Sequence, residues 1–243
     1  MTHMQKRAIW LIGIALFITI SLSFTMTDSK NQPTLHYLVR QPKVQTEKTP
    51  LVILLHGVGS NEANMFSLAD KFPDNFKVIS ARGPLKLGEG SYAWFQVQFG
   101  SNGPVINAEQ AENARKEIIK FIEDISIVEK FDPKQVYLVG FSQGGIMSYS
   151  VALTAPEKVK GIAVMSGRLL KEVRPKVVEE KRLQPLRIFI SHGKQDPVLQ
   201  YSYAEEAVAY LNSKKIHPDF HSYNEVHTIN AKMIEDLAKW LKK

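Results

Sequence analysis

Short apolar runs alternate with amphipathic stretches along most of this chain, and that alternation limits the possible folds more than any other feature. The runs are β-branched and almost uniformly apolar, a pattern typical of strands buried on both faces of a parallel sheet. They are LVILLHG (51–57), FKVISARG (76–83), QVYLVGFS (135–142), KGIAVMSG (160–167) and LRIFISHG (186–193), and LHYLVR (35–40) is expected to be the first strand.

The stretches between the runs have the spacing of helices. In 107–130, apolar residues recur at three- and four-residue steps, and Asn107 can cap the first turn. Residues 143–155, 200–214 and 228–242 are expected to be helices as well. Alternating strands and helices predict an α/β fold with a mostly parallel, doubly wound sheet flanked by helices.

The N-terminal segment differs from the rest of the chain. Lys6 and Arg7 precede AIWLIGIALFITISLSFTMT (8–27), a run without charge that can just span a bilayer and that also fits a signal peptide. We expect residues 1–27 to be a signal peptide or a membrane anchor helix, 28–34 a linker and 35–243 one folded domain. Positive charges before the apolar run favour export, with the domain either anchored to the membrane or released after cleavage.

Charge and cysteine content exclude some functions. The chain has no cysteine, which excludes thiol nucleophiles and disulfides. Its net charge of +7 could indicate nucleic-acid binding, but the densest basic run, RLLKEVRPKVVEEKR (168–182), also contains three glutamates. That run is typical of a solvated helix face, and there is no nucleic-acid motif, so a nucleic-acid partner is not expected.

A serine lies where a predicted strand meets a predicted helix. Gly140-Phe141-Ser142-Gln143-Gly144 fits G-x-S-x-G, and in such a junction the serine occupies a strained turn while the two glycines let strand and helix approach closely. The helix N-terminus also offers N–H groups to a developing oxyanion. This position predicts that Ser142 is a nucleophile, which then needs a base and an orienting carboxylate.

Both partners follow in the order Ser, Asp, His that is typical of α/β-hydrolases. Asp196 comes directly after a predicted strand, although an Asp-Pro turn is an alternative explanation for it. His227 lies between the predicted strand DFHSYN (219–224) and the last helix, where the base belongs. The pair His217 and His221 has the spacing of metal ligands on a helix but falls on or beside a strand, so no metal site is expected.

Two loops complete the candidate site. LLHGVGSN (54–61) places Val58 between two glycines, so its backbone N–H can serve an oxyanion hole. The loop lacks a Walker lysine and a G-x-G-x-x-G pattern, which argues against phosphate binding. Residues 83–104, rich in glycine and aromatic residues, are expected to be an irregular, functional loop bordering an open cleft.

With these residues assembled, the chain resembles the phospholipase/carboxylesterase branch of the α/β-hydrolases, which includes acyl-protein thioesterases and small bacterial carboxylesterases. The resemblance runs from about residue 35 to the end and rests on LLHGVGSNEANMFSLAD, AWF, VYLVGFSQGG, HGKQDPV and YNEVHTIN with LAKWL. It implies the α/β-hydrolase fold without a large lid domain, and it implies no cofactor. One departure concerns Val226, since the family usually has glycine directly before the histidine.

The resemblance also implies a role for each candidate residue. Ser142 would be the nucleophile, Asp196 the orienting acid and His227 the base. The backbone N–H groups of Val58 and Gln143 would form the oxyanion hole, and Trp94 and Phe95 would line the substrate pocket, with core packing as the alternative for Trp94.

These observations predict a serine hydrolase that cleaves carboxylic esters or thioesters through an acyl-enzyme, acting on a small-molecule or lipid acyl substrate. Three alternatives remain open. One is a lysophospholipase or another lipid-directed hydrolase, which a membrane anchor would suit, and a second is a peptidase. The third, a non-catalytic membrane-attached binding protein on a hydrolase scaffold, is disfavoured because all three triad residue types are present.

Overall fold

The computed structural model describes residues 32–100 and 103–243. The proposed signal peptide or anchor, residues 1–27, lies outside the described residues, as does most of the proposed linker 28–34. Among the helices that are described, none is long and apolar enough to cross a membrane.

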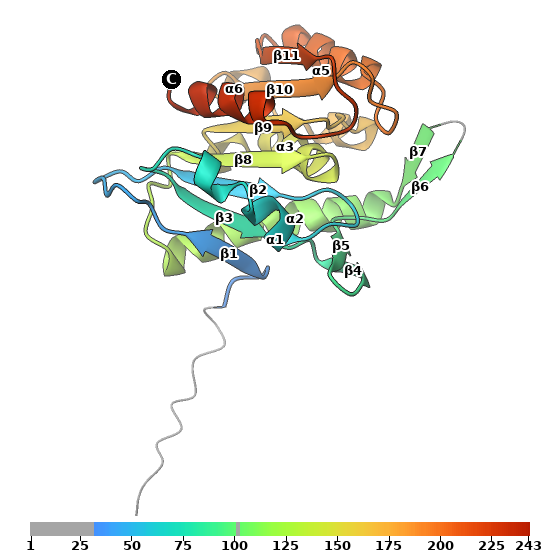
Figure 1. The fold of residues 1–243 in the computed structure, drawn as a ribbon. Helices are drawn as coiled ribbons and strands as arrows, with labels where there is room; N and C mark the ends of the chain where they lie inside the picture. Colours follow the sequence, from blue (N-terminus) through green and yellow to red (C-terminus); the bar gives the residue numbers. More distant parts are fainter. Residues whose placement is uncertain (1–31, 101–102) are drawn as a thin grey trace, which may run out of the picture. The chain divides into compact units, whose positions relative to one another are not determined.

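A seven-stranded sheet forms the centre of the fold, with the strand order β1-β3-β2-β8-β9-β10-β11 (Figure 1). All neighbouring strands in this sheet run parallel except β1, which pairs antiparallel with β3 at one edge. The strands are β1 (Tyr37–Arg40), β2 (Leu51–Leu55), β3 (Lys77–Ala81), β8 (Val136–Phe141), β9 (Gly161–Met165), β10 (Arg187–Gly193) and β11 (Asp219–Tyr223). Each falls within a predicted strand, so the predicted α/β-hydrolase fold is confirmed.

Helices cover both faces of the sheet. They are α1 (Glu62–Phe66), α2 (Ala108–Val128), α3 (Gln143–Thr154), α4 (Glu180–Leu183), α5 (Ser202–Ser213) and α6 (Ala231–Leu241). Successive side chains of a strand point to opposite faces, and the core accordingly divides into two clusters. Helices α2, α3 and α5 pack in one cluster, and α1 and α6 pack in the other. Asn107 caps α2 as predicted, since its side chain accepts a hydrogen bond from the Gln110 N–H.

The prediction of an irregular loop over 83–104 was wrong. The segment folds into two small antiparallel hairpins, β4 (Leu85–Gly88) with β5 (Ser91–Ala93) and β6 (Val97–Gly100) with β7 (Gly103–Ile106). The glycines that suggested a loop include Gly90 and Gly103, which have positive φ angles of 64° and 89° and so suit hairpin turns. Within the described residues no large lid domain is inserted.

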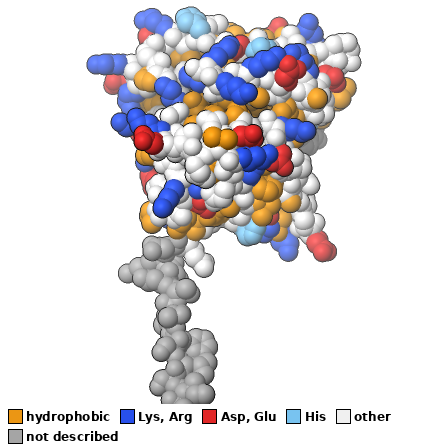
Figure 2. Space-filling view, turned by 60° about the vertical axis from the view of Figure 1, so that its left-hand side comes forward, with side chains coloured by type: hydrophobic (Ala, Val, Ile, Leu, Met, Phe, Trp, Pro, Cys, Tyr) orange, Lys and Arg blue, Asp and Glu red, His pale blue; other side chains and the backbone are white. Residues whose placement is uncertain are grey.

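Basic and acidic side chains are mixed on the surface. Figure 2 shows one face of the molecule, on which Lys and Arg side chains lie among Asp, Glu and neutral side chains. Ion pairs are common on the helices, for example Lys239 with Glu235 and Lys232 with Asp236 on α6. The basic run 168–182, interpreted as a solvated helix face, instead forms a 3-10 helix over Lys171–Lys176 and the short helix α4, with irregular segments between.

Candidate active site

The turn between β8 and α3 places Ser142 at the carboxyl edge of the sheet. Ser142 has φ 53° and ψ −115°, a strained backbone conformation for a residue with a side chain. The flanking glycines bring helix and strand into direct contact. A Cβ on Gly140 would lie 2.2 Å from the Gly144 backbone, and one on Gly144 would lie 2.0 Å from the Leu55 carbonyl oxygen of β2. Only glycine therefore fits at either position.

Three side chains from separate loops form a continuous chain of hydrogen bonds. The Ser142 Oγ lies 2.9 Å from His227 Nε2, and His227 Nδ1 lies 2.6 Å from Asp196 Oδ2. Ser142 follows β8, Asp196 follows β10 and His227 follows β11, so the parallel strands bring all three to one edge. An imidazole held in this way can accept the hydroxyl proton at Nε2 while Nδ1–H remains bonded to the carboxylate.

Asp196 is buried and held by several donors. Its Oδ1 accepts the backbone N–H groups of Val198 at 2.9 Å and Leu199 at 2.8 Å. His192 Nε2 lies 3.3 Å from Oδ2 and 2.7 Å from the Leu199 carbonyl oxygen, to which it donates. Burial raises the pKa of this carboxyl, but hydrogen bonds from His192, His227 and the Leu199 N–H outweigh it and hold the pKa well below its usual range. Asp196 is therefore an anion at neutral pH.

The loop after β2 lies directly against Ser142, because a Cβ on Gly57 would be 3.3 Å from the Ser142 Cβ. Within the described part of the chain, neither the Val58 N–H nor the Gln143 N–H has a protein acceptor. Gln143 is the first residue of α3, where backbone N–H groups lack a partner in the helix. One unbonded donor thus belongs to the loop packed against Ser142, and the other to the residue that follows Ser142.

His56 stabilises this loop. Burial lowers its pKa, so the ring is neutral. Nδ1–H donates to the Gly57 carbonyl at 2.7 Å and Nε2 accepts the Gly83 N–H at 2.9 Å, which fixes one tautomer. His56 therefore shapes the loop that carries Val58.

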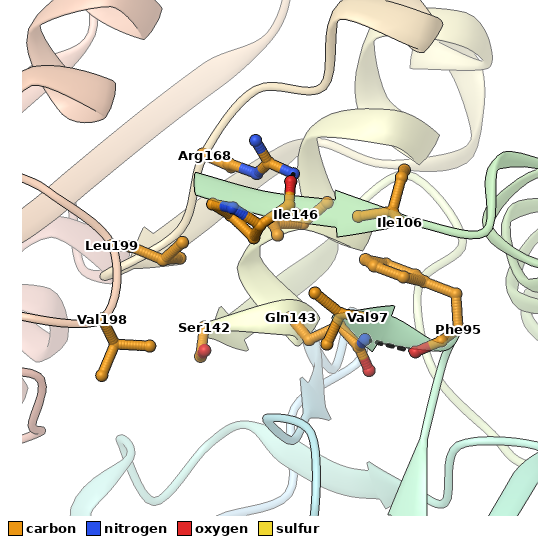
Figure 3. A pocket seen from close by; sticks show the side chains of 10 residues that line it. Phe95, Val97, Ile106, Ser142, Gln143, Ile146, Arg168, Val198 and Leu199 are labelled. Carbon is orange, nitrogen blue, oxygen red and sulfur yellow. Dashed lines mark hydrogen bonds between the residues drawn. The ribbon is translucent and has the colours of Figure 1, made fainter. Parts of the chain in front are cut away.

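A pocket opens beside Ser142 and encloses about 300 Å³ of empty space, part of it open to solvent (Figure 3). Most of the lining side chains are apolar, and they come from the β6–β7 hairpin, from α3 and from the loop after Asp196. The lining residues are Phe95, Val97, Pro104, Ile106, Ser142, Gln143, Ile146, Arg168, Val198 and Leu199.

The two aromatic residues predicted for the pocket have different positions. Phe95 lines the pocket, but Trp94 does not, contrary to the expectation from the resemblance. The Trp94 indole turns away and donates its Nε1–H to the His56 carbonyl at 2.9 Å, where it is almost completely buried. It lines a separate hollow next to α2. Trp94 therefore supports the loop that carries Val58.

The side chain of Gln143 has a role that the sequence did not indicate. Its Oε1 accepts the Trp94 N–H at 2.7 Å. Its Nε2 donates to the Phe95 carbonyl at 2.7 Å, the bond drawn in Figure 3. Gln143 therefore holds the Trp94-Phe95 backbone against the start of α3. The x position of a G-x-S-x-G motif gives no signal for such a contact.

The pair His217 and His221 is not assembled into a metal site. His217 lies 3.0 Å from Asn212 Oδ1, and His221 on β11 lies 2.8 Å from Asp219 Oδ1. Among the described residues, no group of three or more potential metal ligands is gathered.

Comparison with known proteins decides the family. The family model described as phospholipase/carboxylesterase matches residues 37–243, which is most of the chain. The chain belongs to this family.

Curated members of the phospholipase/carboxylesterase family are similar over most of their length. Acyl-protein thioesterase 1 of Mycosarcoma maydis is 26% identical, and the match covers 85% of this chain and 95% of the relative. Carboxylesterase SOBER1 of Arabidopsis thaliana is 26% identical, with 79% and 89% covered. The crystal structure of the Bacillus cereus carboxylesterase has the same fold, with a TM-score of 0.75, 23% identity, and 86% and 93% covered. The chain is a carboxylic ester hydrolase of this family.

Val226, the departure from the family pattern, fits without displacing its neighbour. Val226 does not have a positive φ angle, so a residue with a side chain is compatible with the backbone there, and its side chain is 49% exposed. The backbone before His227 lies close to Gly193 of β10, where a Cβ would lie 2.3 Å from the Glu225 carbonyl oxygen and 2.5 Å from the Val226 carbonyl oxygen. The loop is thereby packed against β10, and His227 reaches Asp196 and Ser142.

Proposed function

We propose that the protein hydrolyses carboxylic esters or thioesters through an acyl-enzyme on Ser142. The observation that carries the proposal is the continuous hydrogen-bonded chain from Ser142 Oγ through His227 to Asp196. A hydroxyl, a base and a buried carboxylate in this order are the elements that an acyl-transfer mechanism requires.

The geometry supports a role for each residue. His227 Nε2 removes the Ser142 proton as Oγ attacks the carbonyl carbon, and Asp196 stabilises the imidazolium that results. The N–H groups of Val58 and Gln143 bind the oxyanion of the tetrahedral intermediate. His227 then gives its proton to the leaving alcohol or thiol, and the same residues activate the water that hydrolyses the acyl-enzyme.

Active-site labelling tests this proposal on the full chain. A fluorophosphonate probe should label the wild-type protein on Ser142, and the protein should cleave p-nitrophenyl butyrate and a butyryl thioester. Ser142→Ala should remove labelling and both activities, since a missing nucleophile costs about 10⁶-fold in kcat. Ser126→Ala is the control, because Ser126 is exposed on α2. A folded wild-type protein that resists the probe, or activity that persists in Ser142→Ala, would refute the mechanism.

We also propose that the catalytic domain is exported, with residues 1–27 as anchor or signal peptide. Lys6 and Arg7 before an uncharged run of twenty residues support this proposal. Fractionation of cells that make the full chain or a form without residues 1–27 tests it. Equal recovery of both forms in the cytoplasmic fraction would contradict it.

A further inference from the structure

Arg168 stands out among the residues that line the pocket beside Ser142. Of the ten residues drawn in Figure 3, it is the one with a charged side chain, and all the others except Ser142 and Gln143 are apolar. The mechanism proposed above gives this guanidinium no task. A permanent positive charge in an otherwise apolar substrate pocket therefore needs a separate explanation.

The chain holds Arg168 firmly at this edge of the sheet. Arg168 follows the turn after β9, in which Ser166 has a positive φ of 50° and its N–H donates to the Ser191 carbonyl at 2.8 Å. A Cβ on Gly167 would lie 2.6 Å from Val164 Cγ1 and 3.1 Å from the Gly145 backbone, so this turn packs directly on the first turn of α3. The backbone from which the Arg168 side chain extends is therefore held in place relative to Ser142.

The guanidinium is left with few partners. One Nη2–H donates to the Pro104 carbonyl at 3.1 Å, and the group stacks over the Tyr203 ring at 5.5 Å. The Nε atom is buried without a hydrogen-bond partner. In the part of the chain that the structure describes, no carboxylate lies within 4 Å of Arg168.

Three other arginines among the described residues are neutralised by a carboxylate. Arg82 pairs with Glu62, Arg115 with Glu112 and Arg182 with Glu157. A guanidinium presents five N–H donors in a planar fork that matches a carboxylate, and such pairs strengthen when water is partly excluded. Arg168 lines the pocket, and the Pro104 carbonyl oxygen is the acceptor that its guanidinium has among the described residues.

We infer that Arg168 binds a carboxylate carried by the substrate, so that the pocket selects esters with an anionic terminus. This inference rests on the proposed function, since it names the substrate class of the same site. An ester group at Ser142 and a carboxylate at Arg168 are joined by a short apolar chain that contacts Ile146 and Leu199. Half-esters of short dicarboxylic acids have this form, as do acetate esters of short hydroxy acids.

Two pairs of matched substrates test the inference. Monomethyl glutarate is compared with methyl 5-methylhexanoate, in which an isopropyl group replaces the carboxylate. For the leaving-group side, 4-acetoxybutanoate is compared with 4-methylpentyl acetate. A larger preference in the first pair means that the acyl part of the ester occupies the pocket. A larger preference in the second pair means that the alcohol part does. Monomethyl succinate and adipate extend the series, and the best length measures the span from Ser142 to Arg168.

We expect wild-type kcat/KM to be about 10- to 100-fold higher for the anionic member of one pair, the effect of one charge-assisted hydrogen-bonded pair. Arg168→Gln retains a donor for the Pro104 carbonyl but removes the charge, so it should abolish the preference, chiefly by raising KM for the anionic ester. Arg168→Lys should retain part of it. Arg174→Gln is the matched control, because Arg174 also stacks over a tyrosine and has a buried, unbonded Nε but does not line the pocket.

The outcomes separate this inference from the proposed function. A wild-type protein that cleaves the neutral esters as fast as the anionic ones refutes the role of Arg168 and leaves the esterase proposal intact. A preference that survives unchanged in Arg168→Gln refutes it as well, and Arg168→Met, which also removes the charge, is the second variant if the first does not fold. A protein that cleaves no ester and resists the fluorophosphonate probe refutes the proposed function itself.

Discussion

Two sides of the same pocket are built in different ways. On the side of Ser142, backbone segments touch each other, and Gly140 and Gly144 leave no space for a single added carbon. On the opposite side, the β6–β7 hairpin contributes partly exposed side chains, and Val105 between two lining residues is 66% exposed. The catalytic serine is positioned by backbone contacts that leave no space for a larger residue. The side chains of the β6–β7 hairpin that line the pocket can be substituted without altering those contacts.

After loss of the nucleophile itself, the largest expected effect concerns Asp196 on the rigid side. Asp196→Asn should lower kcat/KM about 10³- to 10⁴-fold, because the amide Nδ2 would face His227 Nδ1 and favour the wrong tautomer. The measurement is hydrolysis of p-nitrophenyl butyrate by the full chain.

Asp132→Asn provides a closely matched control. Asp132 also precedes a proline and accepts a backbone N–H two residues on, from Lys134 at 2.9 Å, but it lies away from the site. It should retain activity within about threefold, as expected of a surface substitution. Equal, small losses in the two variants would show that Asp196 is only a turn residue.

Gly144→Ala tests whether the rigid side tolerates change. The new Cβ would lie 2.0 Å from the Leu55 carbonyl oxygen, and backbone on backbone cannot relax by a rotamer change. We expect a loss of more than about 3 kcal/mol in the free energy of unfolding, measured by urea denaturation.

Gly100→Ala is the corresponding change on β6, where a Cβ would meet its nearest atom, the Gly103 carbonyl oxygen, at 4.0 Å. It should alter the free energy of unfolding by less than about 1 kcal/mol. If both glycine variants were equally stable, the contrast between the two sides of the pocket would be lost.

The smallest expected effect lies on the hairpin side. Ile106→Ala enlarges the pocket, so the ratio of kcat/KM for p-nitrophenyl hexanoate over acetate should change by about tenfold. Stability should change by less than about 1.5 kcal/mol because Ile106 is only half-buried. Val105→Ala on the outer face of β7 is the control and should leave the ratio as it is. A ratio that shifts equally in both variants would contradict a lining role for Ile106.

The side of the pocket that carries Ser142 could be predicted from the sequence, and the side formed by the β6–β7 hairpin could not. Ser142, Asp196 and His227 could be located because buried strands leave a clear apolar pattern, and parallel strands must end at one edge. The β6–β7 hairpin that lines the pocket could not be predicted. Its two strands are short and contain glycine, as a loop does, so the sequence does not distinguish them from a loop.

Two adjacent aromatic residues illustrate the limit. Trp94 and Phe95 share one motif, but the first holds the His56 carbonyl and the second lines the pocket. Both residues lie in a bend between β5 and β6, where no regular periodicity fixes the direction of a side chain, so a motif alone does not show which of the two faces the substrate.

The long separation between Ser142 and His227, 85 positions apart in the sequence, has a consequence for biosynthesis. The ribosome finishes the nucleophile and the α3 helix well before β10 and β11 exist, and the base can reach the serine only after both strands have joined the sheet. A nascent chain thus carries an unactivated serine, and acyl transfer begins only when the last part of the sheet is in place.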